Sequence, residues 1–277
     1  MLLLAGCPSS QHWGTHERVA LGERGAGARR IVALAPDVTE IAFALGCGER
    51  IVAVGPSADF PPEARAIPRL DPNDAESILV LAPDLLLATT AGNDPRVVTR
   101  LQELGVAVFT ADVTSCGSLA TTCEALGEVL GESERGARLA AEISRRCELA
   151  ARSAAALPTA RALYVVWWEP LIVAAPGTFH DDLLRLAGLA NAAPRGAGRY
   201  PRVDPELLLD PRLEVAVTPA DVEVVAGLQR LLTSPAYRSL SRPSLRVIRL
   251  PADAASRPGP RLPEALEALV AARVCER

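Results

Sequence analysis

Two stretches of alternating short apolar strands and helices, separated by a long strand-free helical stretch, most constrain how this chain can fold. In the first stretch, helices alternate with strands that we predict at residues 31–35, 51–54, 85–89 and 106–110. Short apolar strands that alternate with helices are typical of a parallel α/β sheet. Residues 115–157 carry helical spacing only, and a helix over 134–157 would span roughly 35 Å. The α/β pattern restarts at Arg161.

This organisation predicts the fold class and the domains. We expect an α/β protein with two parallel-sheet lobes, joined by one long backbone helix, with a ligand cleft between the lobes. Asp37, with Glu40 three residues later, predicts a capping box at the start of the first helix. The predicted segments are a truncated signal and tether at 1–29, an N-terminal lobe at 30–114, the connecting long helix at 115–157, and a C-terminal lobe at 158–277.

Composition excludes several classes of protein. The formal net charge of −4 lacks the excess of positive charge that is typical of proteins that bind DNA or RNA. All 29 basic residues are arginine, which excludes Schiff-base lysines and phosphate loops that need a lysine. The longest apolar stretches, such as residues 78–87, are interrupted by Pro or Asp, whereas a membrane-spanning helix needs about 20 apolar residues.

The first residues resemble a signal for export and lipidation. Leu4-Ala5-Gly6-Cys7 resembles a bacterial lipobox, in which small residues precede the cysteine that receives the lipid. The apolar lead before it is short for a signal peptide. We therefore expect lipidation at Cys7 in the cell envelope, and the alternative is a frayed N-terminus that matches by chance.

The other cysteines give no metal site. None of them has the spacing of a zinc ligand set, so packing in the core is their default interpretation. In an exported protein, Cys123 and Cys147 could bridge two neighbouring helices, and the sequence leaves this open. They are Cys47, Cys116, Cys123, Cys147 and Cys275.

We find no catalytic constellation in the sequence. There is no GxSxG elbow and no HExxH motif, and His180 is the only histidine in the predicted folded part. Asp181 and Asp182 follow it at a helix start, where acidic side chains complement the helix dipole. The chain is therefore predicted to have no catalytic residues, no resident metal and no cofactor. The rival interpretation is an envelope enzyme that binds a metal at His180 with Asp181 or Asp182.

The few aromatic residues lie where ligands bind in α/β lobes. Phe60 follows a strand in a Pro-rich loop, Trp167 and Trp168 end the first strand of the second lobe, and Tyr200 lies in a Gly-rich loop. Ligands collect beyond the carboxyl ends of parallel strands, and aromatic rings there suit a large flat ligand. Alternation along the strand predicts that one of the two tryptophans packs in the core.

Several short motifs, spread over both predicted lobes, together carry a family resemblance. They are residues 35–40, 57–62, 76–85, 92–93, 111–115, 200–206 and 253–261. These motifs resemble the cobalamin-binding proteins of ABC importers, which belong to the helical-backbone receptors that also bind haem and ferric siderophores. The family's first-lobe tryptophan, shortly before Glu76, has no counterpart here. Its second-lobe disulfide is also missing, because Ala187 replaces one cysteine.

The resemblance implies a binding protein without catalysis. It places Phe60, Tyr200, Asp253 and one of Trp167 and Trp168 against a corrinoid ligand in the cleft. It implies one docking glutamate per lobe, Glu76 and Glu206, which pair with arginines of the importer's transmembrane subunits. The expected protein is a monomer in the periplasm or cell envelope that contacts the membrane only through a lipid anchor. Haem or a ferric siderophore is the alternative ligand, for which Arg195, Arg199 and Arg202 supply positive charge.

Overall fold

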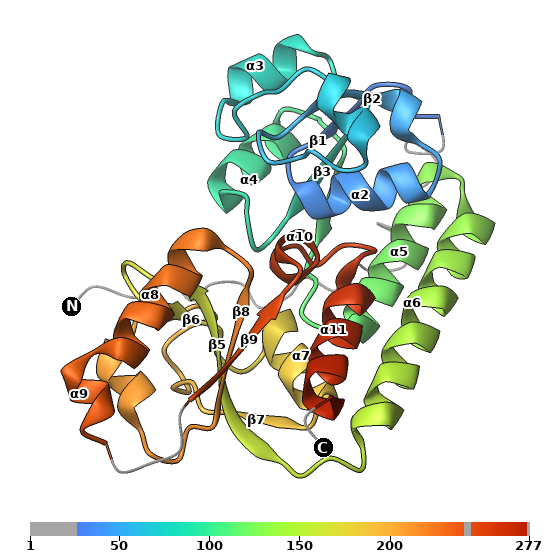
Figure 1. Ribbon diagram of the computed structural model, residues 1–277. Coiled ribbons are helices and arrows are strands. Elements are labelled where there is room, and N and C mark those ends of the chain that lie inside the picture. Colours follow the sequence, from blue (N-terminus) through green and yellow to red (C-terminus); the bar gives the residue numbers. More distant parts are fainter. Residues whose placement is uncertain (1–26, 241–244, 276–277) are drawn as a thin grey trace. The chain divides into compact units, whose positions relative to one another are not determined.

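Two compact units make up the described part of the chain. The structure, a computed structural model, describes residues 27–240 and 245–275 (Figure 1). Unit 1 contains the chain up to Asp112 together with Thr122–Arg138. Unit 2 contains Val113–Thr121 and the chain from Leu139 onward. In the described residues no helix is both long and apolar enough to cross a membrane.

Unit 1 is built on a four-stranded parallel sheet, in the order β2-β1-β3-β4. Its strands are almost entirely buried, as expected where helices cover both faces of a parallel sheet. The predicted strands and helices of this region are confirmed. They are β1 (Ile31–Ala33), α2 (Pro36–Ala44), η1 (Gly48–Arg50), β2 (Ile51–Val54), η2 (Pro62–Ala66), α3 (Ala75–Val80), β3 (Leu85–Thr89), α4 (Pro95–Glu103) and β4 (Val108–Ala111).

The predicted capping box at the start of α2 is wrong. The N-cap is Ala35, it makes no side-chain cap hydrogen bond, and Pro36 takes the first helical turn. Proline suits that position because its fixed φ already matches the helix and its missing N–H would have no partner there. Asp37 and Glu40 are instead buried in unit 1.

Burial of Asp37 has a consequence for stability. Desolvation raises the pKa of its carboxyl group to about 6, and its Oδ1 atom has no hydrogen-bond partner. Between pH 4 and 6 the folded chain therefore holds a proton that the unfolded chain has lost, so the free energy of unfolding falls as pH rises through that range. Above pH 6 the ionised group destabilises the fold.

We expect Asp37→Asn to raise the free energy of unfolding at pH 7 by about 2–3 kcal/mol, because a neutral amide avoids the desolvation of a charge. Urea unfolding of both proteins at pH 7 and pH 4.5 measures this. The difference should shrink at the lower pH, and a difference that does not change with pH would contradict the explanation.

The connecting segment contains the long helix predicted over 134–157, preceded by a second helix. Residues 115–157 contain two helices, α5 (Cys116–Leu130) and α6 (Ser133–Ala154), with a turn at Gly131, where φ is +74°. Both helices are shared between the units, because the unit boundaries fall within them, after Thr121 and after Arg138. The chain therefore passes between the units three times rather than once.

In unit 1 the two helices approach each other closely. A Cβ atom added at Gly127 would lie 2.8 Å from the Cα atom of Gly136, so only glycine fits at this crossing. Two arginines fix the adjoining turn. Arg50 donates to the Leu130 carbonyl oxygen over 3.0 Å, and Arg135 donates to the Leu45 carbonyl oxygen over 3.0 Å. The turn between α5 and α6 is therefore tied to η1 and to the end of α2 in unit 1.

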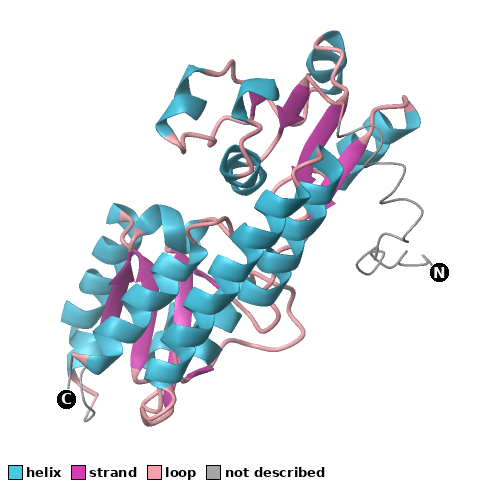
Figure 2. Cartoon of the chain, turned by 90° about the vertical axis from the view of Figure 1, so that its right-hand side faces the viewer, coloured by secondary structure: helices cyan, strands magenta, loops and turns pink. Residues whose placement is uncertain are grey.

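Unit 2 contains a mixed sheet in the order β6-β5-β8-β9, with β7 paired to β5 and β6 antiparallel. Helices flank its strands (Figure 2). The sequence did not indicate β7, α8, α9 or α10. The elements are β5 (Ala160–Trp167), β6 (Ile172–Val173), α7 (Phe179–Leu186), β7 (Leu189–Asn191), η3 (Pro205–Leu209), β8 (Val215–Pro219), α8 (Val222–Thr233), α9 (Pro235–Arg238), β9 (Arg246–Leu250), α10 (Ala252–Ser256) and α11 (Leu262–Val274).

Candidate functional site

The carboxyl ends of three neighbouring strands form one edge of unit 2. Strand β8 lies between β5 and β9, parallel to both, and Tyr164 pairs with Val217 and Pro219 with Leu250. Residues that follow these strands therefore meet along the same edge. This edge carries Trp167 at the end of β5, as the sequence predicted, and Asp253 after β9, which the family resemblance singled out.

The two adjacent tryptophans have different surroundings. Trp168 packs against the apolar core of unit 2 and lies on Gly227 of α8, where an added Cβ atom would meet its ring at 2.1 Å. Trp167 is exposed, and its Nε1 atom donates to the Glu169 carbonyl oxygen over 3.0 Å. The prediction that one of the pair packs in the core is confirmed. Trp167 is the one whose ring is exposed.

The ring of Tyr200 packs against a cluster of three other rings, those of His180, Phe179 and Tyr164. His180 is buried, and its ring centroid lies 3.7 Å from that of Phe179 and 4.2 Å from that of Tyr164. The half-exposed Tyr200 meets it edge-on at 5.7 Å, with its hydroxyl oxygen 3.5 Å from Nδ1. Burial lowers the pKa of His180 to about 3, so the imidazole is neutral. It therefore acts as a packing residue beneath Tyr200.

The loop that carries Tyr200 is attached at both ends. Asn191 Nδ2 donates to the Ala174 carbonyl oxygen over 3.0 Å and to Asp181 Oδ1 over 2.9 Å. At the other end, the Ala175 N–H donates to the Arg199 carbonyl oxygen over 2.9 Å. Between these anchors, residues 194–200 are exposed. Tyr200 is thus presented on a loop whose base is fixed to unit 2.

Asp253 is held in a small charged cluster. Its carboxylate oxygens lie 3.7 Å from Arg257 Nη2 and 3.6 Å from Arg261 Nη1. The acidic side chain is 55% exposed, whereas both arginine side chains are mostly buried. The cluster therefore brings two guanidinium groups to one carboxylate. The sequence prediction found Asp253 but missed both arginines, although Arg257 lies one helical turn later.

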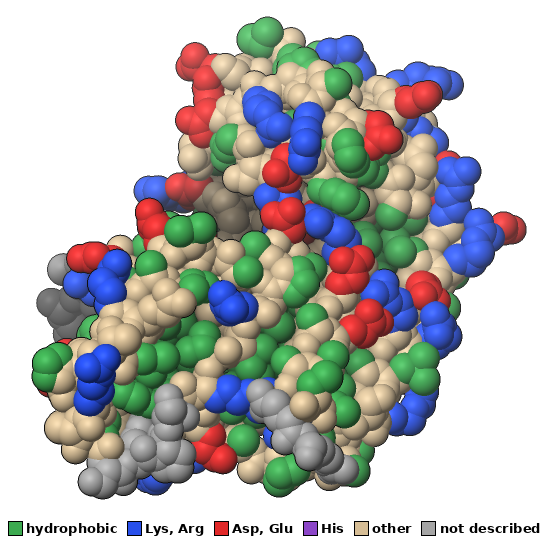
Figure 3. Space-filling view, viewed as in Figure 1, with side chains coloured by type: hydrophobic (Ala, Val, Ile, Leu, Met, Phe, Trp, Pro, Cys, Tyr) green, Lys and Arg blue, Asp and Glu red, His purple; other side chains and the backbone are tan. Residues whose placement is uncertain are grey.

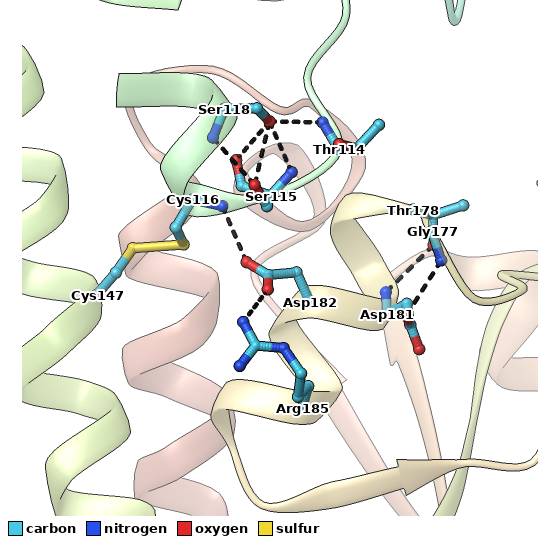
Figure 4. Close-up of polar contacts among 10 residues, drawn as sticks. All are labelled: Thr114, Ser115, Cys116, Ser118, Cys147, Gly177, Thr178, Asp181, Asp182 and Arg185. Atoms are coloured by element: carbon cyan, nitrogen blue, oxygen red, sulfur yellow. Dashed lines mark hydrogen bonds and ion pairs between the residues drawn. A yellow bond between two sulfur atoms is a disulfide. The ribbon is translucent and has the colours of Figure 1, made fainter. Parts of the chain in front are cut away.

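The acidic residues after His180 have structural roles. Asp181 Oδ2 accepts from the Gly177 N–H over 3.1 Å, and Thr178 caps α7 (Figure 4). Asp182 Oδ2 accepts from the Cys116 N–H over 2.9 Å, and Oδ1 pairs with Arg185. In the part of the chain that the structure describes, no three His, Cys, Asp or Glu side chains are grouped to hold a metal ion. Nothing here favours the rival metal enzyme.

A disulfide joins Cys116 of α5 to Cys147 of α6 within unit 2, with 6.6 Å between their Cα atoms (Figure 4). The possible bridge between Cys123 and Cys147 is therefore wrong. Cys123 lies about two turns further along α5 and belongs to unit 1, whereas Cys147 belongs to unit 2. Cys123 is a buried thiol, and desolvation raises its pKa to about 12.

The remaining predicted residues lie on exposed turns. Phe60 follows β2 in unit 1, and its side chain is 37% exposed. Glu76 and Glu206 each occupy the first turn of a short helix, α3 and η3, two residues after a capping aspartate. The prediction that each opens a helical turn is confirmed. Cys7 lies outside the described residues.

Comparison with known proteins decides the family. The family described as "Periplasmic binding protein" matches residues 31–241. The chain belongs to this family of periplasmic binding proteins. This periplasmic binding protein is accordingly a substrate-binding protein and not an enzyme.

Named relatives fall into two ligand groups. A vitamin B12-binding protein of Vibrio cholerae is 32% identical over 194 residues, which are 69% of this chain and 70% of that protein. The crystal structure of the periplasmic vitamin B12-binding protein of Vibrio cholerae has a TM-score of 0.79 at 29% identity, covering 90% of this chain and 97% of that one. A periplasmic haem-binding protein of Roseiflexus has a TM-score of 0.74 at 29% identity, covering 89% and 100%.

Proposed function

We propose that this periplasmic binding protein captures cobalamin or a related corrinoid in the cell envelope and delivers it to an ABC importer. The observation that carries the proposal is the edge of unit 2, where the exposed rings of Trp167 and Tyr200 accompany the charged cluster of Asp253. Exposed rings suit the broad apolar face of a corrin, and charged groups suit its polar rim. The names of the similar proteins favour the same ligand class. Phe60 of unit 1 is proposed as a further contact.

Haem is the second candidate ligand. Arg257 and Arg261 place two guanidinium groups beside Asp253, and guanidinium groups suit a ligand with carboxylate groups. The similarity to a haem-binding protein is nearly as strong as the similarity to the vitamin B12-binding protein. A ferric siderophore would use the same positive charge.

The visible spectrum of the protein, purified from cells grown with cobalamin, distinguishes these ligands. Titration calorimetry with cyanocobalamin and with haem then measures affinity. Replacing Trp167 or Tyr200 by Ala should weaken binding of the cognate ligand by about 1–3 kcal/mol, because each variant removes a rigid aromatic contact. Leu104→Ala, an exposed apolar residue at the end of α4, is the control and should bind normally. Normal binding by both aromatic variants would contradict the proposed site.

Docking on the importer completes the proposal. Glu76 and Glu206 would each present a carboxylate from a separate unit, in the same local setting after a capping aspartate. Two separated charge pairs fix the orientation of a bound partner and steer its approach.

The proposed protein is a monomer in the periplasm, and lipidation at Cys7 is proposed from the lipobox alone. On the face drawn in Figure 3, basic and acidic side chains are interspersed.

A further inference from the structure

Two apolar side chains stand apart from the others in their exposure. Val80 of α3 is 83% exposed and Val222 of α8 is 82% exposed, whereas the next most exposed large apolar side chain of the described residues reaches 47%. Single apolar side chains on a surface are common, so exposure alone assigns no role. The location of each valine distinguishes the two.

Val222 lies on the edge of unit 2 that carries the proposed ligand residues. It follows β8, the strand between β5 and β9, and it stands at the same spacing after its strand as Asp253 does after β9. Trp167 ends β5 on the other side. Because the strands are parallel and in register, the row along this edge is Trp167, Val222 and Asp253.

The start of α8 is held in place, so the exposure of Val222 is a fixed feature. The Asp221 carboxylate accepts from the Glu223 N–H over 2.9 Å and from the Val224 N–H over 3.2 Å. Further along the helix, Val224 and Leu228 are buried in the core, and the Trp168 ring lies on Gly227.

The fold itself gives Val222 no structural role. It is the first residue of α8, whereas a hydrophobic staple would use the residue before the N-cap and the fourth residue of the helix. It is absent from the buried face of α8. An apolar side chain held in water at a ligand-binding edge gains free energy when an apolar surface covers it.

We propose that Val222 is a ligand-contact residue whose methyl groups pack against the apolar face of the bound ring system, between Trp167 and Asp253. This inference rests on the proposed function and adds a specificity determinant to it. A tetrapyrrole or corrin face would cover the valine, whereas a ligand with a polar surface would not.

Val222→Thr tests the contact, because threonine keeps the branched shape and replaces a methyl group by a hydroxyl. In calorimetric titrations of the full chain with cyanocobalamin and with haem, we expect the variant to bind the cognate ligand about 5- to 30-fold more weakly. Val80→Thr is the matched control, since this valine is equally exposed but lies where α3 leads into the start of β3. The control should bind normally, and both variants should keep the wild-type melting temperature.

The possible outcomes separate this inference from the proposed function. Normal binding by Val222→Thr, with weakened binding by Trp167→Ala and Tyr200→Ala, would overturn the inference alone. An equal loss in Val80→Thr would also overturn it, since the effect would not depend on the edge of unit 2. A wild-type chain that binds neither cyanocobalamin nor haem would overturn the proposed function and this inference with it.

Discussion

Reversing both carboxylates proposed for docking, Glu76→Arg together with Glu206→Arg, should abolish corrinoid uptake while leaving corrinoid binding intact. Each side chain is exposed on the first turn of its helix, in a different unit, and neither touches the edge that carries Trp167 and Asp253 in the described contacts. The reversal would replace the two proposed attractive charge pairs with the importer by two repulsive ones. Uptake of labelled cobalamin and pull-down of the importer complex measure the effect.

Loss of two helix-start acids could act through stability instead, because each is stabilised by the helix dipole by about 0.3–1 kcal/mol. Glu63→Arg with Glu264→Arg is the matched control. These glutamates are also exposed, also lie in the first turn of a helix, and also come one from each unit. The control should transport normally. Normal uptake in the Glu76 and Glu206 double variant would show that these two acids serve only their helices.

Cys116→Ser should lower the free energy of unfolding by about 3–4 kcal/mol. The Cys116–Cys147 disulfide closes a loop with a sequence separation of 31, and opening such a loop restores that amount of entropy to the unfolded chain. Urea unfolding with and without dithiothreitol measures it. Reductant should destabilise the wild type to the level of the variant and leave the variant unchanged.

Cys275→Ser provides the control, because this cysteine is exposed and unpaired among the described residues. It should unfold as the wild type does, in both conditions. A wild-type protein whose unfolding curve is the same after complete reduction, with the new thiols shown by alkylation, would contradict the expected contribution of the disulfide.

Most of the strands could be predicted, because parallel strands are buried on both faces and appear as short apolar runs. Residues 51–54 and 85–89 show this plainly, and the structure gives them the same bounds. The first helix start was less predictable. Asp37 and Glu40 have the spacing of a capping box, but Pro36 begins the helix one residue earlier and draws both acids into the interior.

The disulfide partner could have been found from helix geometry. Two helices that fold back at Gly131 place residues side by side when they lie equally far from the turn. Gly127 and Gly136 meet under that rule, and Cys116 and Cys147 fit it as well, whereas Cys123 does not. The informative feature was the turn at Gly131, because the spacing of the cysteines within α5 does not indicate which cysteine of α6 each one faces.

The candidate site was predictable only in part. Trp167, Tyr200 and Asp253 follow from their places after strands and in loops, together with the family resemblance. The support beneath Tyr200 was not predictable, because His180 reaches it through tertiary packing with Tyr164 and Phe179. Val222 also escaped notice, since a valine in sequence carries no sign of being exposed.

The division of α5 and α6 between the units bears on how this chain can be dissected. Residues 113–121 belong with unit 2, although unit 1 supplies the chain on both sides of them. No single cut in the gene can therefore separate the units cleanly. A fragment that ends at Arg138 also carries residues 113–121 of unit 2, and one that begins at Val113 also carries residues 122–138 of unit 1. A fragment that holds one whole unit without cutting a helix must carry both α5 and α6. Recombination between relatives would have to exchange the helical pair as one block.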